Sequence, residues 1–243
     1  MIVLSVGMPR AGSGWHYNLV HDLVVAAGGQ NAREIRRRFL LGPVLTEVNC
    51  NIGALTTKRL LPVLVPSLLG NTFVIKAHAG PKPYALRLIE NGRMRTTYIY
   101  RDPRAALLSA YEYGQRGLKD GRVNAFGHLT DIDTAIEFML EYVDIWEAWM
   151  AEENVLHVRY EDLLGDYDLE MQHLADFLDI DAQLPAVVAV ADKYRPGQNE
   201  PGQKGLHFHK GQPERFRTAL TAAQLEACAQ AFGPYLERMG YEL

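Results

Sequence analysis

The chain has 243 residues, of which 48% are hydrophobic and 22% are charged, and its formal net charge is −4 at pH 7. These values are ordinary for a globular protein, and the acidic balance gives no electrostatic reason to expect DNA or RNA as a partner. The two cysteines, Cys50 and Cys228, are far apart in the sequence, which favours a reducing compartment over a disulfide scaffold. We expect a single domain over residues 1–243, cytoplasmic and without a membrane span.

The first sixteen residues predict a strand, a glycine-rich loop and the start of a helix. Ile2 to Val6 form an apolar run that is typical of a strand buried on both faces. Three glycines and a proline follow, and apolar residues then recur with helical spacing from Trp15. This order of elements aims backbone N–H groups at an anion on the helix N-terminus. Arg10, inside the loop, adds a fork of donors that matches phosphate oxygens.

Two interpretations of this loop remain open at this point. Gly7 and Gly12 have the spacing of a P-loop, but Ser13 and Gly14 stand where a lysine and a serine or threonine should follow. The missing lysine disfavours a nucleoside triphosphatase. The alternative without a ligand is a turn whose glycines serve packing alone.

A second candidate site lies at residues 73–78. Phe73 to Ile75 predict a buried strand, and Lys76 and His78 lie at or just beyond its carboxyl end. In a doubly wound sheet, ligands bind outside the carboxyl ends of the strands. A lone histidine is more often structural than catalytic, but a lysine and a histidine together at a strand end favour a function.

A third candidate site follows the strand predicted for Thr96 to Tyr100. Arg101 lies at the end of this strand, and Asp102 and Pro103 are typical of a helix N-cap and first turn. Ser109 comes eight residues after Arg101, within the predicted helix. The alternative is that Arg101 forms a local salt bridge and that Ser109 is a tolerated helix serine.

The rest of the chain predicts further elements but little chemistry. His207 and His209 are weak evidence for a metal site because no cysteine or acidic ligand lies nearby, so we expect no metal. Residues 35–70 and 112–130 are the expected walls of a substrate pocket. The other expected elements are a polar loop or lid from Gly114 to Gly127, a helix over 132–150, a strand over 155–160, an irregular loop over 192–215, and a C-terminal helix opened by a capping box from Thr221 to Gln224.

Taken in order, these segments resemble the sulfotransferases that use 3′-phosphoadenosine 5′-phosphosulfate (PAPS). The loop Met8-Pro9-Arg10-Ala11-Gly12-Ser13-Gly14-Trp15 is similar to the family's 5′-phosphosulfate loop, and Ile75-Lys76-Ala77-His78 to its Lys-Thr-His segment. Tyr100-Arg101-Asp102-Pro103 with Ser109 resembles the 3′-phosphate motif. Arg159-Tyr160-Glu161-Asp162-Leu163 and His209-Lys210-Gly211 resemble two later family segments.

The resemblance implies a single α/β domain with a P-loop-like parallel sheet flanked by helices. It implies that His78 is the general base and that Arg10 and Lys76 stabilise charge on the oxygen that bridges sulfur and phosphorus. It also implies that Trp15 stacks on adenine. The residues implied to bind the donor are Arg10, Ala11, Gly12, Ser13, Gly14, Trp15, Arg101, Ser109, Tyr160, His209, Lys210 and Gly211.

Three departures from the family pattern concern donor binding. Arg10 stands where the family usually has lysine, which keeps the charge and changes its geometry. Gly14 replaces a hydroxyl residue, so one phosphate donor is lost. His209 replaces an arginine, which either makes that contact sensitive to pH or removes it.

The implied function is transfer of the sulfuryl group of PAPS to a hydroxyl or amine of a small-molecule acceptor, without a metal and with a possible homodimer. The alternatives are a P-loop-like kinase or other phosphotransferase, and a nucleotide-binding module without catalysis. A kinase would need the lysine that the loop lacks. A module that only binds a nucleotide would give no catalytic role to Lys76 and His78, which disfavours this alternative.

Overall fold

A computed structural model gives the fold and describes residues 1–197 and 214–243. The described residues contain a four-stranded parallel sheet in the order β2-β1-β3-β4. The strands are β1 (Ile2–Gly7), β2 (Phe73–Ala77), β3 (Met94–Tyr100) and β4 (Val155–Arg159). The predicted parallel sheet flanked by helices is confirmed.

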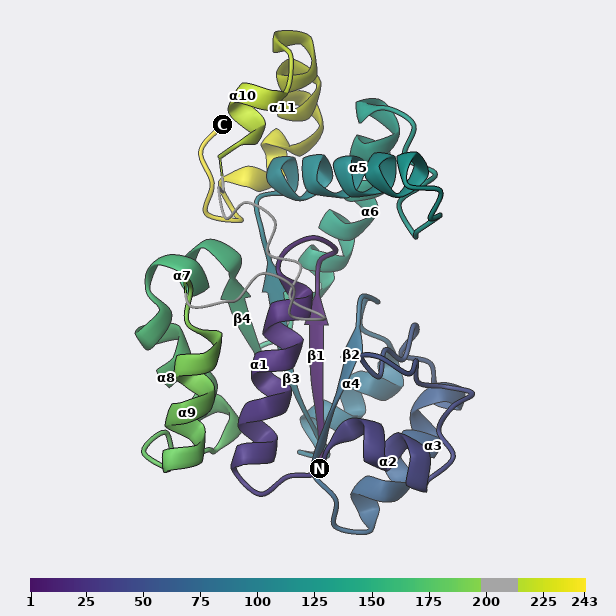
Figure 1. Ribbon diagram of the computed structural model, residues 1–243, viewed down its shortest axis with the longest axis vertical. Coiled ribbons are helices and arrows are strands. Elements are labelled where there is room, and N and C mark those ends of the chain that lie inside the picture. Colours follow the sequence, from purple (N-terminus) through teal and green to yellow (C-terminus); the bar gives the residue numbers. More distant parts are fainter. Residues whose placement is uncertain (198–213) are drawn as a thin grey trace.

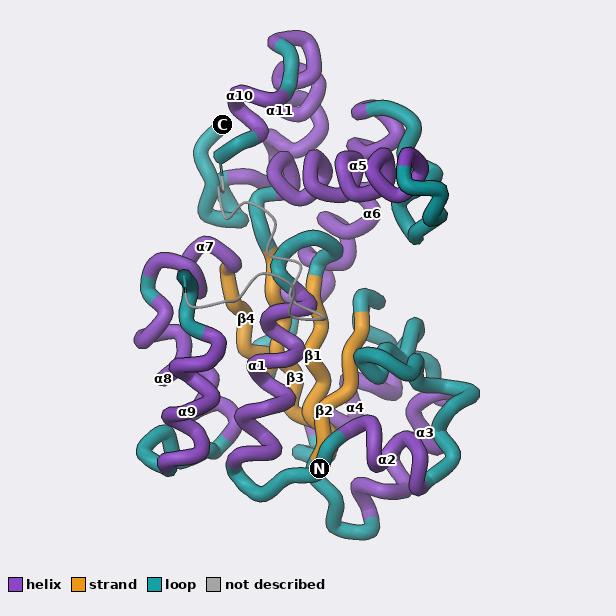
Figure 2. Tube along the Cα trace, viewed as in Figure 1, coloured by secondary structure: helices purple, strands orange, loops and turns teal. Residues whose placement is uncertain are grey.

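The strand order places the ligand-binding edge of the sheet beside β1. The chain passes from β1 to β2 on one side and then returns to β3 on the other side, so the connections diverge at the β1–β3 pair. In open parallel sheets, ligands bind at the carboxyl ends of the strands where the order reverses in this way. Figures 1 and 2 show these ends pointing up, toward α5.

Eleven helices surround the sheet in the described part of the chain (Figure 1). Helices α1, α8 and α9 pack with one another on one face. The bounds are α1 (Ser13–Ala26), α2 (Ala32–Arg38), α3 (Thr57–Leu68), α4 (Pro83–Glu90), α5 (Pro103–Lys119), α6 (Ile132–Met150), α7 (Tyr160–Gly165), α8 (Tyr167–Leu178), α9 (Pro185–Tyr194), α10 (Phe216–Ala219) and α11 (Ala222–Leu236).

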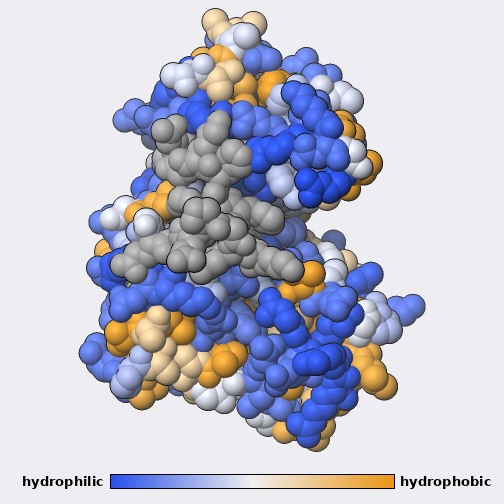
Figure 3. Space-filling view, in the orientation of Figure 1, coloured by the Kyte–Doolittle hydropathy of each residue, from blue (hydrophilic) through white to orange (hydrophobic). Residues whose placement is uncertain are grey.

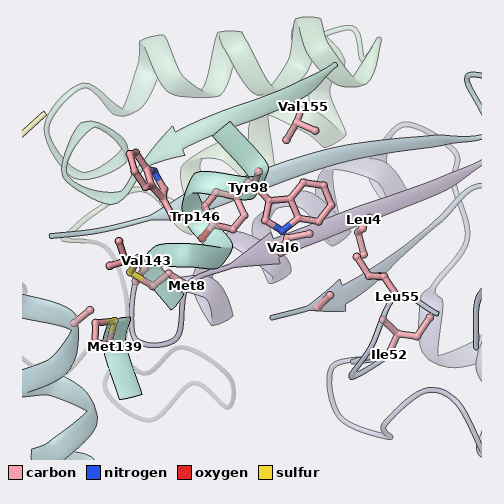
Figure 4. Packing of buried hydrophobic residues seen from close by; sticks show 14 of the residues in the cluster. Leu4, Val6, Met8, Ile52, Leu55, Tyr98, Met139, Val143, Trp146 and Val155 are labelled. Carbon is pink, nitrogen blue, oxygen red and sulfur yellow. The ribbon is translucent and has the colours of Figure 1, made fainter. Parts of the chain in front are cut away.

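Alternation along the strands divides the buried side chains between two faces. Ile2, Leu4 and Val6 of β1 belong to the larger cluster, whereas Val3 packs with α1 in the smaller one. Figure 4 shows part of the larger cluster, where Tyr98 lies between Val6 and Trp146 in this view. The period of two thus fixes which residues of each strand face α1, including the polar residues discussed below.

The expected loop from Gly114 to Gly127 is wrong in its first half, because α5 continues to Lys119. A Cβ atom on Gly114 would lie 2.2 Å from the carbonyl oxygen of Phe126, and one on Gly117 would lie 2.1 Å from the amide nitrogen of Asn124. These glycines therefore allow the chain after α5 to fold back against the helix. The glycines that favour a loop in the sequence therefore serve close packing.

Two helices between β1 and β3 were not predicted. Helix α3 contains Pro62 and Pro66 and buries Leu60 and Val63, and α4 follows the second strand. The prolines hid a helical pattern in α3 because proline usually ends a helix. At the C-terminal end, the capping box is confirmed: the Thr221 hydroxyl accepts from the Gln224 N–H, and the Gln224 side chain accepts from the Thr221 N–H.

Within the described residues, helices long and apolar enough to cross a membrane are absent.

Candidate active site

The loop after β1 is held in a specific backbone conformation at the carboxyl end of the sheet. The Met8 N–H donates to the Ile99 carbonyl at 2.9 Å, which attaches the loop to β3. Arg10 has φ of 63° and Gly12 has φ of 76°, both in the left-handed region. A Cβ atom on Gly12 would lie 2.6 Å from the Tyr160 ring, so glycine is needed both for the turn and for the contact.

Among the described residues, the N-terminus of α1 has no capping side chain that would compete with an anion. Gly12 occupies the N-cap position, makes no side-chain cap bond, and no acidic residue lies in the first turn. The backbone N–H groups of Ser13, Gly14 and Trp15 therefore lie at the positive end of a 14-residue helix. Ala11 is buried beneath this turn. Backbone groups in this arrangement suit a phosphate or phosphosulfate.

Arg10 is held by α5. Its Nε donates to the Ser109 hydroxyl at 3.1 Å, and its guanidinium lies 4.6 Å from the centre of the Tyr113 ring. The Phe126 ring lies on the same group, at 5.9 Å. Burial lowers the pKa of Arg10, but guanidinium remains protonated in proteins. Arg10 is therefore a fixed, planar cation at the end of β1.

Arg101 lies next to Arg10. Its Nη1 is 3.4 Å from the Arg10 carbonyl oxygen, and its guanidinium lies 4.6 Å from the centre of the Tyr160 ring. Ser109 reaches the same region because α5 runs across the end of β3 (Figure 1). The structure thus brings Arg10, Arg101 and Ser109 together. The expected N-cap is confirmed as well, since the Asp102 carboxylate accepts from the Arg104 N–H at 2.9 Å.

Lys76 is a buried residue of β2, 5% exposed, in register with Ser5 of β1. Ser5 bonds His16 of α1, Oγ to Nδ1, at 3.0 Å. Burial, and then the nearby Arg10, lower the pKa of Lys76 to about 8. Burial, and then Lys76, lower the pKa of His16 to about 3, so His16 is neutral near pH 7. Lys76 therefore stays mostly protonated at pH 7, beside a His16 ring that adds no second positive charge.

His78 lies at the carboxyl end of β2 and is oriented by β1. Its Nδ1 is 2.6 Å from the Gly7 carbonyl oxygen. Because a carbonyl only accepts, Nδ1 carries the hydrogen and the neutral ring keeps a lone pair on Nε2. Burial, and then Lys76, lower the pKa of His78 to about 4. The imidazole is therefore neutral and able to accept a proton at Nε2.

Trp15 and Tyr160 pack beneath the loop. Trp15 is 3% exposed, donates from Nε1 to the Tyr194 carbonyl at 3.0 Å and stacks on Tyr167. Tyr160 contacts Trp15 edge to face and lies under Arg101. Trp15 is thus a core residue in this structure, and its stacking on adenine stays a prediction. His209, Lys210 and Gly211, with His207, lie outside the described residues.

Sequence reasoning missed the side chains that hold the two arginines. Tyr113 follows Ser109 by one helical turn, a spacing that could have placed both beside Arg10 had α5 been extended. In the sequence, Glu161 is only part of a family segment, but its Oε1 lies 3.7 Å from Arg101 Nε. No local signal in the sequence indicates that pairing, because the two residues are far apart along the chain.

The site combines cations with one neutral base at a single sheet edge. Figure 3 shows the surface indented between the part that contains α5 and the part that contains the sheet. Arg10, Arg101, Lys76 and the open α1 N-terminus favour an anionic ligand, and His78 can accept a proton. The arrangement can therefore bind a phosphorylated or sulfated molecule and deprotonate a second reactant.

Solved structures of similar fold include several sulfotransferases. The mouse sulfotransferase SULT7A1 complexed with PAP is 15% identical, with a TM-score of 0.61 over 97% of this chain and 84% of that chain. Retinol dehydratase in a complex with retinol and PAP is 15% identical, with a TM-score of 0.60 over 100% of this chain and 82% of that chain. The same enzyme with androsterone and inactive cofactor PAP is 16% identical and has a TM-score of 0.58, over 100% and 82% of the two chains.

At these identities the structural comparison establishes the shared fold alone. The family is established by a separate comparison with family models. No curated protein matches the chain. The family model for the sulfotransferase domain matches residues 3–240, nearly the whole chain. The chain therefore belongs to the sulfotransferase family.

Proposed function

We propose that this sulfotransferase takes PAPS as donor and transfers the sulfuryl group to a hydroxyl or amine of a small molecule. The observation that carries the proposal is the position of His78, whose Nε2 keeps its lone pair beside a cluster of cations. A neutral base next to an anion site is what sulfuryl transfer to a protic acceptor requires.

The residues present fit such a donor. The N–H groups at the start of α1 and the Arg10 guanidinium would hold the 5′-phosphosulfate. Arg101, which follows β3, and Ser109 of α5 both lie beside Arg10. These two residues would hold the 3′-phosphate. Ligand complexes of similar structures contain PAP, the nucleotide that remains after sulfuryl transfer. When bound, the donor supplies an activated sulfur atom attached through a phosphate.

His78 would accept the proton of the attacking hydroxyl or amine at Nε2 as the new bond to sulfur forms. The hydrogen bond from Nδ1 to the Gly7 carbonyl keeps that lone pair directed away from β1 and strengthens as the ring gains charge. The sulfur–oxygen bond to the leaving phosphate breaks in the same transfer, and its electron pair stays with that oxygen.

Arg10 and Lys76 would stabilise the negative charge that develops on the leaving oxygen. Arg10 is fixed by Ser109 and Tyr113, so little reorganisation is needed during the reaction. Lys76 is buried, which makes its interaction with a nearby charge stronger than in water. Retinol and androsterone occur in complexes of a structural neighbour, which supports a small-molecule acceptor here as well.

A nucleotide screen followed by a transfer assay tests this function. Thermal unfolding is measured with PAP, ATP and GTP, each with and without magnesium, and we expect PAP alone to raise the melting temperature. PAPS is then supplied with phenols, alcohols and amines, and we expect PAP release that depends on an acceptor. A shift with ATP and magnesium but not with PAP would favour the phosphotransferase alternative. Binding of PAP without transfer to any acceptor would favour a binding module.

A further inference from the structure

Glu161 has no function in the reaction described so far, although it lies in the Arg-Tyr-Glu-Asp-Leu segment that the resemblance singles out. It belongs to the first turn of α7, directly after Tyr160, and its side chain is 18% exposed. Its Oε1 and the Nε of Arg101 are 3.7 Å apart, and within the described residues neither atom has a hydrogen-bond partner. The two buried groups therefore face each other as an ion pair.

The other oxygen of Glu161 is held from the C-terminal segment. The Tyr241 hydroxyl donates to Oε2 at 2.7 Å. That segment is attached on both sides of Tyr241, since Arg159 donates to the Gly240 carbonyl and Arg104 to the Glu242 carbonyl. The Glu161 carboxylate thus has a fixed position between α7 and the C-terminal segment.

The contacts of Arg101 show what this fixed carboxylate can do. The Tyr160 ring fixes the plane of the guanidinium, and the Arg10 carbonyl lies near one terminal nitrogen. Glu161 faces Nε, which leaves the hydrogens of Nη2 and one of Nη1 without a partner among these three groups. Those hydrogens form the edge with which an arginine grips two oxygens of one phosphate.

We propose that Glu161, held by Tyr241, is a positioning residue that orients Arg101 toward the 3′-phosphate of the donor. This inference rests on the proposed function, because it assumes that Arg101 binds that phosphate. Burial raises the pKa of Glu161, and the hydrogen bond from Tyr241 and the charge of Arg101 oppose that effect. The two residues that Glu161 connects therefore both favour its charged form.

A carboxylate near a phosphate also repels it, so the experiment must separate orientation from repulsion. The probes are PAP and adenosine 5′-monophosphate (AMP), which differ only in the 3′-phosphate, and their dissociation constants are measured by calorimetry. We expect Glu161→Gln to weaken PAP binding by on the order of tenfold, the lower end of what residues that orient metal ligands contribute. Binding of AMP should change by less than about twofold. Tyr241→Phe should have the same effect on PAP to a smaller degree.

The Arg101→Ala background tests whether Glu161 acts through the arginine. There, Glu161→Gln should no longer weaken PAP binding, because there is no guanidinium left to orient. The matched control is Asp168→Asn, which breaks the ion pair between Asp168 of α8 and Arg195. This variant should bind both ligands as the wild type does. Thermal unfolding without ligand shows whether each variant folds, and Tyr241→Phe provides a milder change if Glu161→Gln does not.

The outcomes distinguish this inference from the proposed function. Wild-type protein that does not bind PAP would overturn both. Wild-type protein that prefers PAP over AMP, with Glu161→Gln equal to or tighter than wild type for PAP, would overturn the inference alone. Equal weakening of PAP and AMP would assign Glu161 a purely structural role.

Discussion

The ionisable groups at the ends of β1 and β3 are held differently from those at the end of β2. Arg10 and Arg101 each lie over a tyrosine ring and beside a polar or acidic side chain. Lys76 and His78 lie over no aromatic ring in the described residues, and burial is the main cause that lowers the pKa of each, as it is for Arg10. Guanidinium keeps its charge when buried, whereas ammonium and imidazolium are more readily neutralised.

This difference matches the two tasks of a transferase site. A group that binds an anion must keep its charge and geometry, which stacking and hydrogen bonding provide. A group that accepts a proton must be neutral beforehand, and desolvation provides that near pH 7. We therefore assign donor binding to the ends of β1 and β3, and proton transfer to His78 at the end of β2, where Lys76 adds a cation for the leaving oxygen. The predictions below test that division.

The largest expected effect is loss of turnover in His78→Ala. A positioned base contributes on the order of 10²- to 10⁴-fold, so single-turnover transfer should slow by that factor. Affinity for PAP should stay within a few-fold, because the assigned role concerns the acceptor. His173→Ala, on the half-exposed histidine of α8, is the matched control. A rate above about a tenth of wild type would show that another group or solvent takes the proton.

The second prediction concerns the opposite edge. Arg101→Ala should weaken PAPS binding by on the order of 10²-fold, since hydrogen bonds to charged groups contribute about 1.5 to 3 kcal/mol each. Affinity for adenosine 5′-phosphosulfate, which lacks the 3′-phosphate, should barely change. Calorimetry with both nucleotides on both proteins gives the difference directly, with Arg195→Ala, at a partly exposed arginine paired with Asp168, as control. Equal weakening of the two ligands would mean that Arg101 is structural.

A feature of this molecule can be predicted from the sequence when the residues that determine it lie close together along the chain. Strands, the loop with Arg10, and the positions of Lys76 and His78 follow from short apolar runs and from the residues directly after them. These residues meet because parallel strands end at one edge, so topology alone brings them together. The fold and the cations of the site were therefore predictable.

Features that depend on distant contacts were not predictable from local patterns. Gly114 is typical of a loop, because no local pattern in the sequence indicates its close contact with Phe126. The surroundings of Trp15 depend on Tyr194, which lies 179 residues away. The pairing of Arg101 with Glu161 likewise requires β3 and the start of α7 to be placed in space.

The third prediction uses pH to examine the end of β2. Lys76 has a pKa of about 8 and is needed as a cation, so kcat/KM should fall about tenfold per pH unit above that value. The His78 pKa of about 4 places the acid limb well below neutrality. Lys76→Arg should move the alkaline limb upward, because guanidinium stays protonated. An unchanged alkaline limb in that variant would assign the titration to another group.

The last prediction concerns stability between pH 6.5 and 4. His78 and His16 have pKa values of about 4 and 3 in the fold, below the ordinary 6.5, so in this window the unfolded chain binds more protons than the folded one. The free energy of unfolding should therefore rise with pH across the window and level off above it. Each histidine contributes at most about 1.4 kcal/mol per pH unit.

Chemical denaturation at a series of pH values measures this dependence, and two variants separate its sources. His78→Gln removes the contribution at the end of β2, and His16→Gln removes that of the fully buried ring beside Ser5. Each variant should flatten the curve between pH 6.5 and 4, whereas His173→Ala on the surface should leave its slope unchanged. If His78→Gln kept the full slope, His78 would be free to become protonated in the fold. The contrast between a desolvated base and paired, permanently charged arginines would then be lost.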